Sequence, residues 1–204
     1  VVAPRITAPL AVYFFCGLHS FPSPVCDSVG DAQIFLVCQL QDSSPDGQWL
    51  RAKAFPLMKA VADFWVSRVT RNDDGSYSIC NVVGADEYAN GVDDNAFTNG
   101  AAIRALEYAC EAARICNEPV PEIWEEVGKG IRILRFKDGV TREHATYNGE
   151  MIKQADVNLL GYPLYFVGDA ESQKKDMEYY VDKIDPQNGP AMSYSVFCVQ
   201  YARM

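Results

Sequence analysis

The sequence predicts a mainly α-helical protein. From residue 31 onward, long apolar segments alternate with turns rich in Gly, Asp, Asn and Pro, the spacing expected of consecutive helices. Extended segments are few, and they do not alternate with the helices in the way a parallel α/β sheet requires. With 204 residues, 49% of them hydrophobic and 22% charged, the chain has enough apolar side chains for one sizeable core.

Helices are predicted wherever a long apolar segment lies between two turns. They cover residues 31–41, 48–69, 98–116, 120–129, 148–162, 170–182 and 190–202. Pro56 lies inside the second of these, and we expect a kink or a new helix start there because proline removes a backbone hydrogen bond and clashes with the preceding turn. Pro190 opens the last one, in the first-turn position that proline favours.

The segment 98–116 gives the clearest helical pattern. Its charged residues recur at spacings of three and four, so that they form one narrow stripe. They are Arg104, Glu107, Glu111 and Arg114. Most other positions are Ala, Ile, Leu, Tyr or Cys, which predicts a helix buried on most of its sides.

Two short segments are predicted to be extended. Residues 76–83 follow an Asp-Gly turn at 74–75. Residues 131–136 alternate in hydrophobicity and meet an Asp-Gly turn at 138–139, as one arm of a hairpin would.

The N-terminal part of the chain gives no regular pattern. Residues 1–30 contain four prolines and show neither a helical nor an alternating period, so they are predicted to be irregular. An apolar stretch at 9–18 is too short to span a bilayer. The expected organisation is therefore an irregular segment over 1–30 and a helical domain over 31–204.

Charge and cysteine content exclude several classes of function. A formal net charge of -9 gives no attraction to phosphate backbones or anionic lipids, so neither nucleic acid nor a membrane is an expected partner. The seven cysteines are scattered and odd in number, which favours buried free thiols. With no N-x-S/T sequon in the chain, they favour a cytoplasmic over a secreted location.

Motifs for cofactors and metals are also missing. There is no P-loop, dinucleotide glycine pattern, G-x-S-x-G, H-E-x-x-H or C-x-x-C, and the chain has two histidines. We therefore expect neither a cofactor nor a metal. Catalysis by the carboxyl groups of Asp and Glu is the type of chemistry that the sequence leaves open.

Acidic residues gather in the loop that precedes the predicted buried helix. The first group is Gly84-Ala85-Asp86-Glu87-Tyr88, and Asp93-Asp94-Asn95 follows it. Side chains on such a loop can reach a ligand while the scaffold stays rigid. Asp94 and Asn95 could equally cap the helix, because Asp and Asn accept hydrogen bonds from free N–H groups at a helix start, and the sequence leaves both interpretations open.

A second polar cluster runs from Glu143 into the segment Lys153-Gln154-Ala155-Asp156. On the predicted helix, Lys153 and Asp156 are three residues apart and could pair, whereas Gln154 would point elsewhere. Polar side chains in an apolar helix need partners, and the residues alone favour an internal partner over a bound polyol.

From about residue 49 to residue 204 the chain resembles glycoside hydrolase family 65, which includes acid trehalases, disaccharide phosphorylases and α-glucosidases. The blocks that carry the resemblance read ADFW at 62–65, GADEY at 84–88, VDDNAFTN at 92–99 and IKQADV at 152–157. The resemblance implies part of an (α/α)6 barrel. The sequence departs from the family's usual pattern at Ala85, where proline is common, and at Asp94, where asparagine is common.

The resemblance also implies roles for individual residues. Glu87 matches the general acid of an inverting enzyme that cleaves α-glucosidic bonds, and Lys153 and Gln154 match residues that hold glucose hydroxyls. Asp86 and Asn95 are expected among the substrate contacts. The catalytic base is not identified, with Glu143 and Glu150 as candidates.

Two alternatives to a hydrolase stay open. A disaccharide phosphorylase would use inorganic phosphate as nucleophile, for which Ser193 and Ser195 are local candidates. A non-catalytic helical fragment is the second alternative, because neither the upstream Trp-Asp sugar-binding block of the family nor its late catalytic region is found in the chain. The expected partners are an α-glucoside and the remainder of the chain's own catalytic domain.

Overall fold

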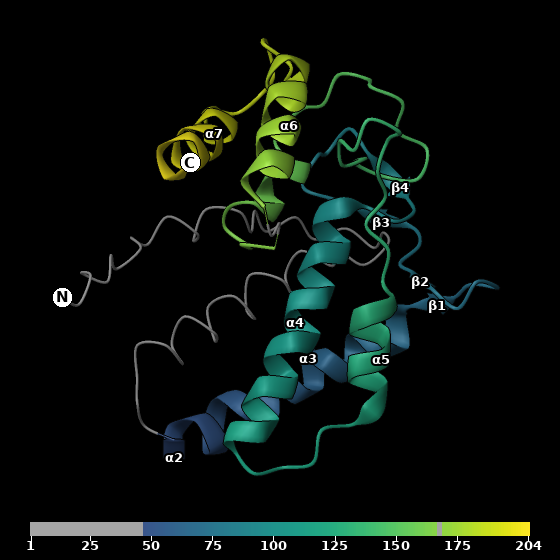
Figure 1. Cartoon of the computed structure of the whole chain (residues 1–204), viewed down its shortest axis with the longest axis vertical. Coiled ribbons are helices and arrows are strands. Elements are labelled where there is room, and N and C mark those ends of the chain that lie inside the picture. Colours follow the sequence, from purple (N-terminus) through teal and green to yellow (C-terminus); the bar gives the residue numbers. More distant parts are fainter. Residues whose placement is uncertain (1–46, 167–168) are drawn as a thin grey trace.

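The computed structural model describes residues 47–166 and 169–204, and the predictions for 1–30 and 31–41 lie outside them. The described residues are mainly helical, which confirms the predicted class (Figure 1). The helices are α2 (Gly47–Trp49), the π-helical turn η2 (Leu50–Ala54), α3 (Phe55–Arg68), α4 (Ala96–Ile115), α5 (Glu122–Gly130), the 3-10 turns η3 (Val157–Leu160) and η4 (Val181–Lys183), α6 (Ala170–Tyr180) and α7 (Ala191–Arg203). Two antiparallel pairs of short strands join β1 (Thr70–Arg71) to β2 (Tyr77–Ser78) and β3 (Val82–Val83) to β4 (Asn90–Val92).

Helix α4 is the central element of the described structure. Helices α3 and α5 pack against it (Figure 1), and the turn η3 also contacts it. Alanine fills most of its buried positions, which lets neighbouring helices approach closely. Arg104 is half-buried, and Glu107, Glu111 and Arg114 are exposed. The predicted charged stripe on an otherwise buried helix is thus confirmed.

Two apolar cores pack against this helix. The first fills the space between α3, α4 and α5, where Trp65 and Trp124 are buried. The second lies against the first half of α4 and takes side chains from η3, α6 and α7. Gly100 permits this second contact, because a Cβ there would lie 2.3 Å from Cδ2 of Leu160.

The predicted interruption at Pro56 appears as a change of helix type within a continuous helical segment. The π-helical turn η2 ends at Ala54, and α3 begins at Phe55 with Pro56 in its first turn. Pro190 similarly stands at the cap position immediately before α7. None of the helices in the two described stretches is long and apolar enough to cross a membrane.

The predicted helix over 148–162 is wrong for most of its length. Only η3 is helical there, and Ile152 instead forms a parallel bridge with Ile184. The amide of Ile152 donates to the carbonyl of Lys183 over 2.9 Å, and its carbonyl accepts from the amide of Asp185 over 2.8 Å. Both groups are therefore unavailable to a helix, and Gly149 at φ 104° lies outside the helical region.

The predicted extended segments form only in part. Residues 76–83 divide into β2 and β3. The turn at 138–139 closes through a bond of 2.8 Å from the amide of Phe136 to the carbonyl of Val140. Around it, residues 131–136 make isolated bridges rather than a strand.

Candidate functional site

Glu87 lies on the segment between β3 and β4, just before the start of α4. We call residues 84–88 the acid loop. The carboxylate of Glu87 forms an ion pair with Nζ of Lys153, which is 66 residues away in sequence. The Glu87 side chain is 59% exposed and that of Lys153 is 28% exposed, so both charges can reach a ligand. The structure thus brings together the predicted acid and one predicted glucose-binding residue.

Asp86 fixes the acid loop from the inside. Its residue exposure is 2%, and its Oδ1 accepts hydrogen bonds from the amides of Lys153 at 2.7 Å and Tyr88 at 3.2 Å. Burial raises the pKa of this carboxyl, and the hydrogen bonds from backbone amides oppose that rise. The expected contact between Asp86 and substrate does not fit this position, because the carboxyl group faces the interior.

Asp156 anchors the other end of the acid loop. Its carboxylate is fully buried, and Oδ2 accepts from the amides of Ala85 at 2.8 Å and Asp86 at 3.3 Å. Burial raises its pKa to about 6. The predicted pair with Lys153 is wrong, since Lys153 turns toward Glu87 and Asp156 binds backbone amides.

Gln154 and Asn95 support the same loop. The side-chain amide of Gln154 donates to the carbonyl of Ala85, which is the internal partner that the residues alone favoured. Asn95 is fully buried and caps α4, with Oδ1 accepting from the amide of Thr98 at 2.9 Å and Nδ2 donating to Asp156 at 3.0 Å. Direct contact between Asn95 and a sugar therefore does not fit, because both polar atoms have internal partners.

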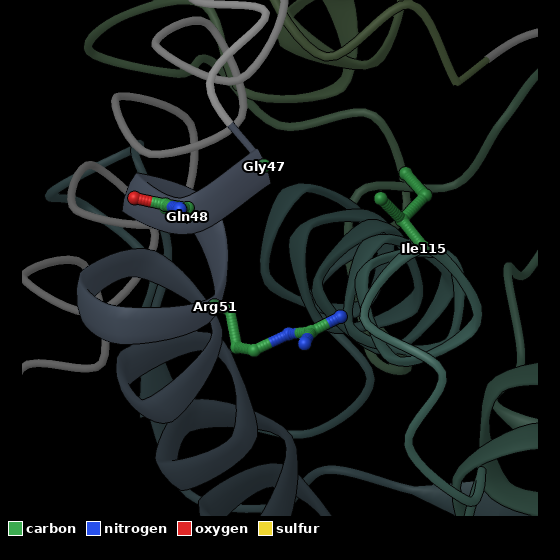
Figure 2. Close-up of a pocket in the computed structure, with 4 residues that line it drawn as sticks. All are labelled: Gly47, Gln48, Arg51 and Ile115. Atoms are coloured by element: carbon green, nitrogen blue, oxygen red, sulfur yellow. The ribbon is translucent and has the colours of Figure 1, made fainter.

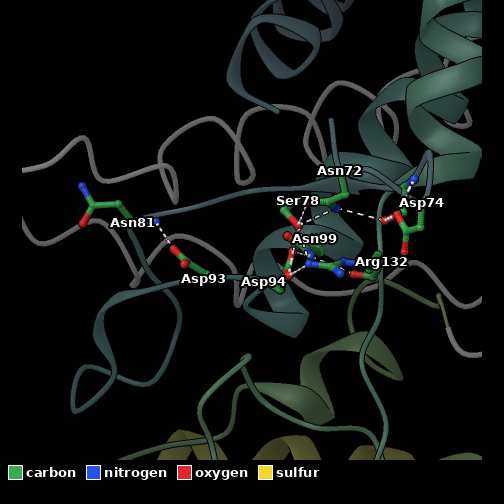
Figure 3. A network of polar contacts seen from close by, with 9 residues as sticks. Asn72, Asp74, Ser78, Asn81, Asp93, Asp94, Asn99 and Arg132 are labelled. Carbon is green, nitrogen blue, oxygen red and sulfur yellow. Dashed lines mark hydrogen bonds and ion pairs between the residues drawn. The ribbon is translucent and has the colours of Figure 1, made fainter. Parts of the chain in front are cut away.

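Asp94 belongs to a separate polar network. It adopts φ 54°, and its Oδ2 forms an ion pair with Nη2 of Arg132 at 2.5 Å and accepts from Oγ of Ser78 at 3.1 Å (Figure 3). Asn99 of α4 donates to both Asp94 and the carbonyl of Arg132. Sequence reasoning missed Arg132, and the Asp94 carboxylate pairs with it, whereas Asn95 caps α4.

Glu143 is unsuited to be the catalytic base. Its exposure is zero, and neither carboxyl oxygen receives a hydrogen bond from an N–H or hydroxyl group of the described residues. Burial, followed by the charges of Asp156 and Asp86, raises its pKa to about 10, so the group is neutral near pH 7. Glu150 is exposed, and a hydrogen bond from the amide of Asn148 lowers its pKa.

The serines considered for phosphate binding have internal partners. Ser193 is fully buried, and its Oγ accepts from the amide of Ala155 at 2.9 Å. Ser195 donates to the carbonyl of Ala191 within its own helix at 3.4 Å. Both hydroxyl groups therefore have partners within the described residues, and a role toward phosphate stays a prediction.

Tyr88 ties the acid loop to residues that sequence reasoning missed. Its hydroxyl donates to Oδ2 of Asp185 at 2.7 Å, and Asn188 donates to the same oxygen at 2.9 Å. These bonds hold the pKa of Asp185 well below its usual range. The bridge between Ile152 and Ile184 brings Asp185 beside the site, and no local pattern in the sequence predicts that long-range pairing.

A separate cavity of about 380 Å³ lies between α2 and the end of α4, lined by Gly47, Gln48, Arg51 and Ile115 (Figure 2). The acid loop precedes the start of α4, and a 20-residue helix is about 30 Å long, so the cavity and the site are far apart. No group of three His, Cys, Asp or Glu side chains in residues 47–166 and 169–204 is placed to hold a metal ion.

Known proteins resemble this chain over most of its length. It is 46% identical over 159 residues to a kojibiose hydrolase of Flavobacterium johnsoniae, which aligns 78% of the chain with 23% of that protein. It is 38% identical over 166 residues to a protein-glucosylgalactosylhydroxylysine glucosidase of Dictyostelium discoideum, aligning 78% of the chain with 23% of that protein. An acid trehalase of Emericella nidulans is 36% identical over 173 residues, which cover 83% of the chain and 16% of the trehalase. The chain thus spans about a quarter or less of the length of these relatives.

Fold and family comparisons agree with these relatives. A solved structure described as a kojibiose phosphorylase from the human microbiome superposes with a TM-score of 0.70 at 16% identity, covering 85% of this chain and 30% of that one. That likeness shows a shared fold. The sequence profile of the glycosyl hydrolase family 65 central catalytic domain matches residues 28–147, more than half of the chain. The chain therefore belongs to glycosyl hydrolase family 65.

Proposed function

We propose that the protein carrying this chain is an inverting hydrolase of α-glucosidic bonds, with Glu87 as its general acid. The observation that carries the proposal is an exposed carboxylate on a loop whose backbone is fixed from inside, in direct contact with a lysine. The hydrolase names of the similar proteins support the choice of reaction and of α-glucosides as substrate class.

The proposed chemistry follows from the two exposed charges. A departing sugar oxygen needs a proton, which a positioned carboxyl group can donate. A glucose ring bound between Glu87 and Lys153 would separate the pair and exclude water, which favours the protonated form of a carboxyl group. Lys153 would then hold a ring hydroxyl. Inversion further requires a second carboxylate roughly 6.5–9.5 Å from the acid to activate water.

The remaining predicted site residues have a supporting role in this proposal. Gln154, Asp86 and Asn95 are each 4% exposed or less, and each bonds within the acid loop or its neighbours. We propose that they set the position of Glu87 and Lys153 rather than bind sugar directly. Mutating them should therefore lower turnover more than it changes substrate affinity.

We also propose that residues 31–204 form part of an (α/α)6 barrel, whose remainder is the chain's partner. The mainly helical fold and the likeness to a larger helical protein support this. A cytoplasmic location stays a prediction from the cysteines and the missing sequon, and a yeast relative is named a periplasmic acid trehalase.

The test of the acid is Glu87→Gln in the full-length protein. Glutamine keeps the shape of the carboxyl group but cannot donate its proton, so turnover of an α-linked glucose disaccharide should fall at least about a hundredfold. Glucosyl fluoride, whose leaving group needs that proton far less, should lose less rate. Glu118→Gln, at another exposed glutamate, is the matched control and should leave both rates unchanged.

Equal losses on both substrates would assign Glu87 to binding or to water activation, and no loss would remove it from the mechanism. A disaccharide phosphorylase is the second candidate, favoured by the fold shared with a protein described as a phosphorylase. Release of glucose 1-phosphate rather than glucose in phosphate buffer would select it. A full-length protein that cleaves no α-glucoside by either route would leave the non-catalytic alternative.

A further inference from the structure

Three buried carboxyl groups meet behind the acid loop. Asp86, Glu143 and Asp156 are exposed by 2%, 0% and 0% respectively. Three negative charges in one buried cluster would repel strongly, and so the cluster requires a counter-ion or a proton. The charged groups that act most strongly on Glu143 are the carboxyl groups of Asp156, Asp86 and Glu150. The neighbouring Arg142 turns its guanidinium to the carbonyl of Tyr147 and to Asn148 instead. Burial lowers the pKa of the neighbouring His144, and Tyr147 and Tyr180 lie in the same buried surroundings.

The hydrogen bonds identify which carboxyl group carries the proton. Asp86 and Asp156 each accept from backbone amides, which stabilise their ionised forms. Glu143 accepts from none of the described donors. Its polar partner is the carboxyl group of Asp86, and a hydrogen bond between two carboxyl groups forms only when one of them is protonated. Glu143 is therefore the donor and Asp86 the acceptor.

Asp86 controls the backbone on both sides of Glu87. Its Oδ1 accepts from the amide of Tyr88, which follows Glu87, and from the amide of Lys153, whose side chain pairs with Glu87. The position of the Asp86 carboxylate thus sets both members of the exposed pair. A group that holds the Asp86 carboxylate in place therefore also sets the positions of Glu87 and Lys153, without contacting either of them.

We propose that Glu143 is a positioning residue for Glu87: its neutral carboxyl group donates a hydrogen bond to Asp86 and so holds the acid loop in the geometry that proton donation requires. This rests on the proposed function of Glu87. When Glu143 cannot donate, the ionised Asp86 lies beside Asp156 without the hydrogen bond that stabilises its charge. The two carboxylates then repel each other, and the acid loop shifts. A displacement of about 1 Å at a catalytic group can cost on the order of a hundredfold in rate.

Two substitutions in the full-length protein test the proposal. Glu143→Gln supplies an amide N–H in place of the carboxyl proton and should keep turnover within about threefold of wild type. Glu143→Met fills similar space without a donor and should lower kcat on an α-linked glucose disaccharide on the order of a hundredfold, with little change in KM. Its loss on glucosyl fluoride should be smaller, because that substrate depends less on the acid. A merely structural role would lower both rates equally.

The outcomes separate this proposal from its rivals. If the glutamine and methionine variants lose kcat equally, Glu143 acts in its ionised form. If the methionine variant keeps the wild-type kcat, the hydrogen-bond donor is not needed. Either result overturns the proposal. An infrared difference spectrum of wild type against Glu143→Gln at pH 7 gives a readout that needs no activity and no methionine variant. We expect the carbonyl band of a protonated carboxyl group in wild type, and its absence would overturn the proposal. Wild-type protein without glucosidase activity, but with this band, would refute the role of Glu87 alone.

Discussion

Replacing Glu143 by glutamine should make the protein more resistant to unfolding as the pH rises. The folded structure holds the pKa of Glu143 at about 10, above the ordinary 4.5, because the group is buried beside two other carboxyl groups. Between those two values the folded state keeps a proton that the unfolded state releases. Stability from this group is therefore fully present below pH 4.5 and is lost as the pH rises toward 10. Glutamine has no such proton.

The size of the effect follows from proton linkage. One proton held only by the folded state lowers the free energy of unfolding by about 1.36 kcal/mol per pH unit. From pH 6 to pH 8 the glutamate protein should lose about 2.7 kcal/mol from this group alone. Because other titrating groups are common to both proteins, the stability difference between Glu143→Gln and wild type should grow by about that amount.

The measurement is urea unfolding of both proteins at pH 6 and pH 8, followed by circular dichroism. The quantity to compare is the variant's stability minus that of wild type at each pH. A difference that does not change with pH would mean that Glu143 is ionised when folded or titrates normally. Glu143 would then not be the protonated member of the buried cluster, whether or not the full-length protein cleaves α-glucosides.

Two further substitutions test how the acid loop is held. Gly84→Ala would place a Cβ 2.5 Å from Oδ2 of the buried Asp156, so we expect a loss of about 1–3 kcal/mol in thermal unfolding, whereas Gly47→Ala, with no atom within 4 Å, is the neutral control. A Gly84→Ala protein as stable as wild type would show that the loop can move away freely. Tyr88→Phe removes the 2.7 Å bond to Asp185 and should cost about 1 kcal/mol in chemical unfolding, and an unchanged midpoint would contradict a role for that bond.

Local patterns predicted the elements that local interactions determine. Helix α4 was expected from 98 to 116 and runs from Ala96 to Ile115, because its charged stripe and alanine-rich faces follow the helical repeat. The change of helix type at Pro56 likewise follows from the chemistry of a single residue. Such features need no knowledge of distant parts of the chain.

Long-range contacts explain what the sequence could not predict. The segment 148–162 has a helix-like apolar pattern, but Ile152 uses its backbone to pair with Ile184, 32 residues later. The structure brings all five predicted site residues close together. The side chains of Glu87 and Lys153 are accessible, whereas the other three residues are buried and form hydrogen bonds within the protein. Exposure depends on which segments cover a residue, and no spacing in the sequence encodes it.

The order in which the chain leaves the ribosome bears on when the acid loop is first held in place. The core between α3, α4 and α5 draws on residues 50–131 and can close early. The bond between Ala85 and Asp156 spans 71 residues, and that between Tyr88 and Asp185 spans 97. Closing loops of this length costs more conformational entropy than closing short ones, and so these contacts form late. During synthesis the helical scaffold should therefore exist before Glu87 has a fixed position, and the acid loop gains all of these contacts only after residue 185 has emerged.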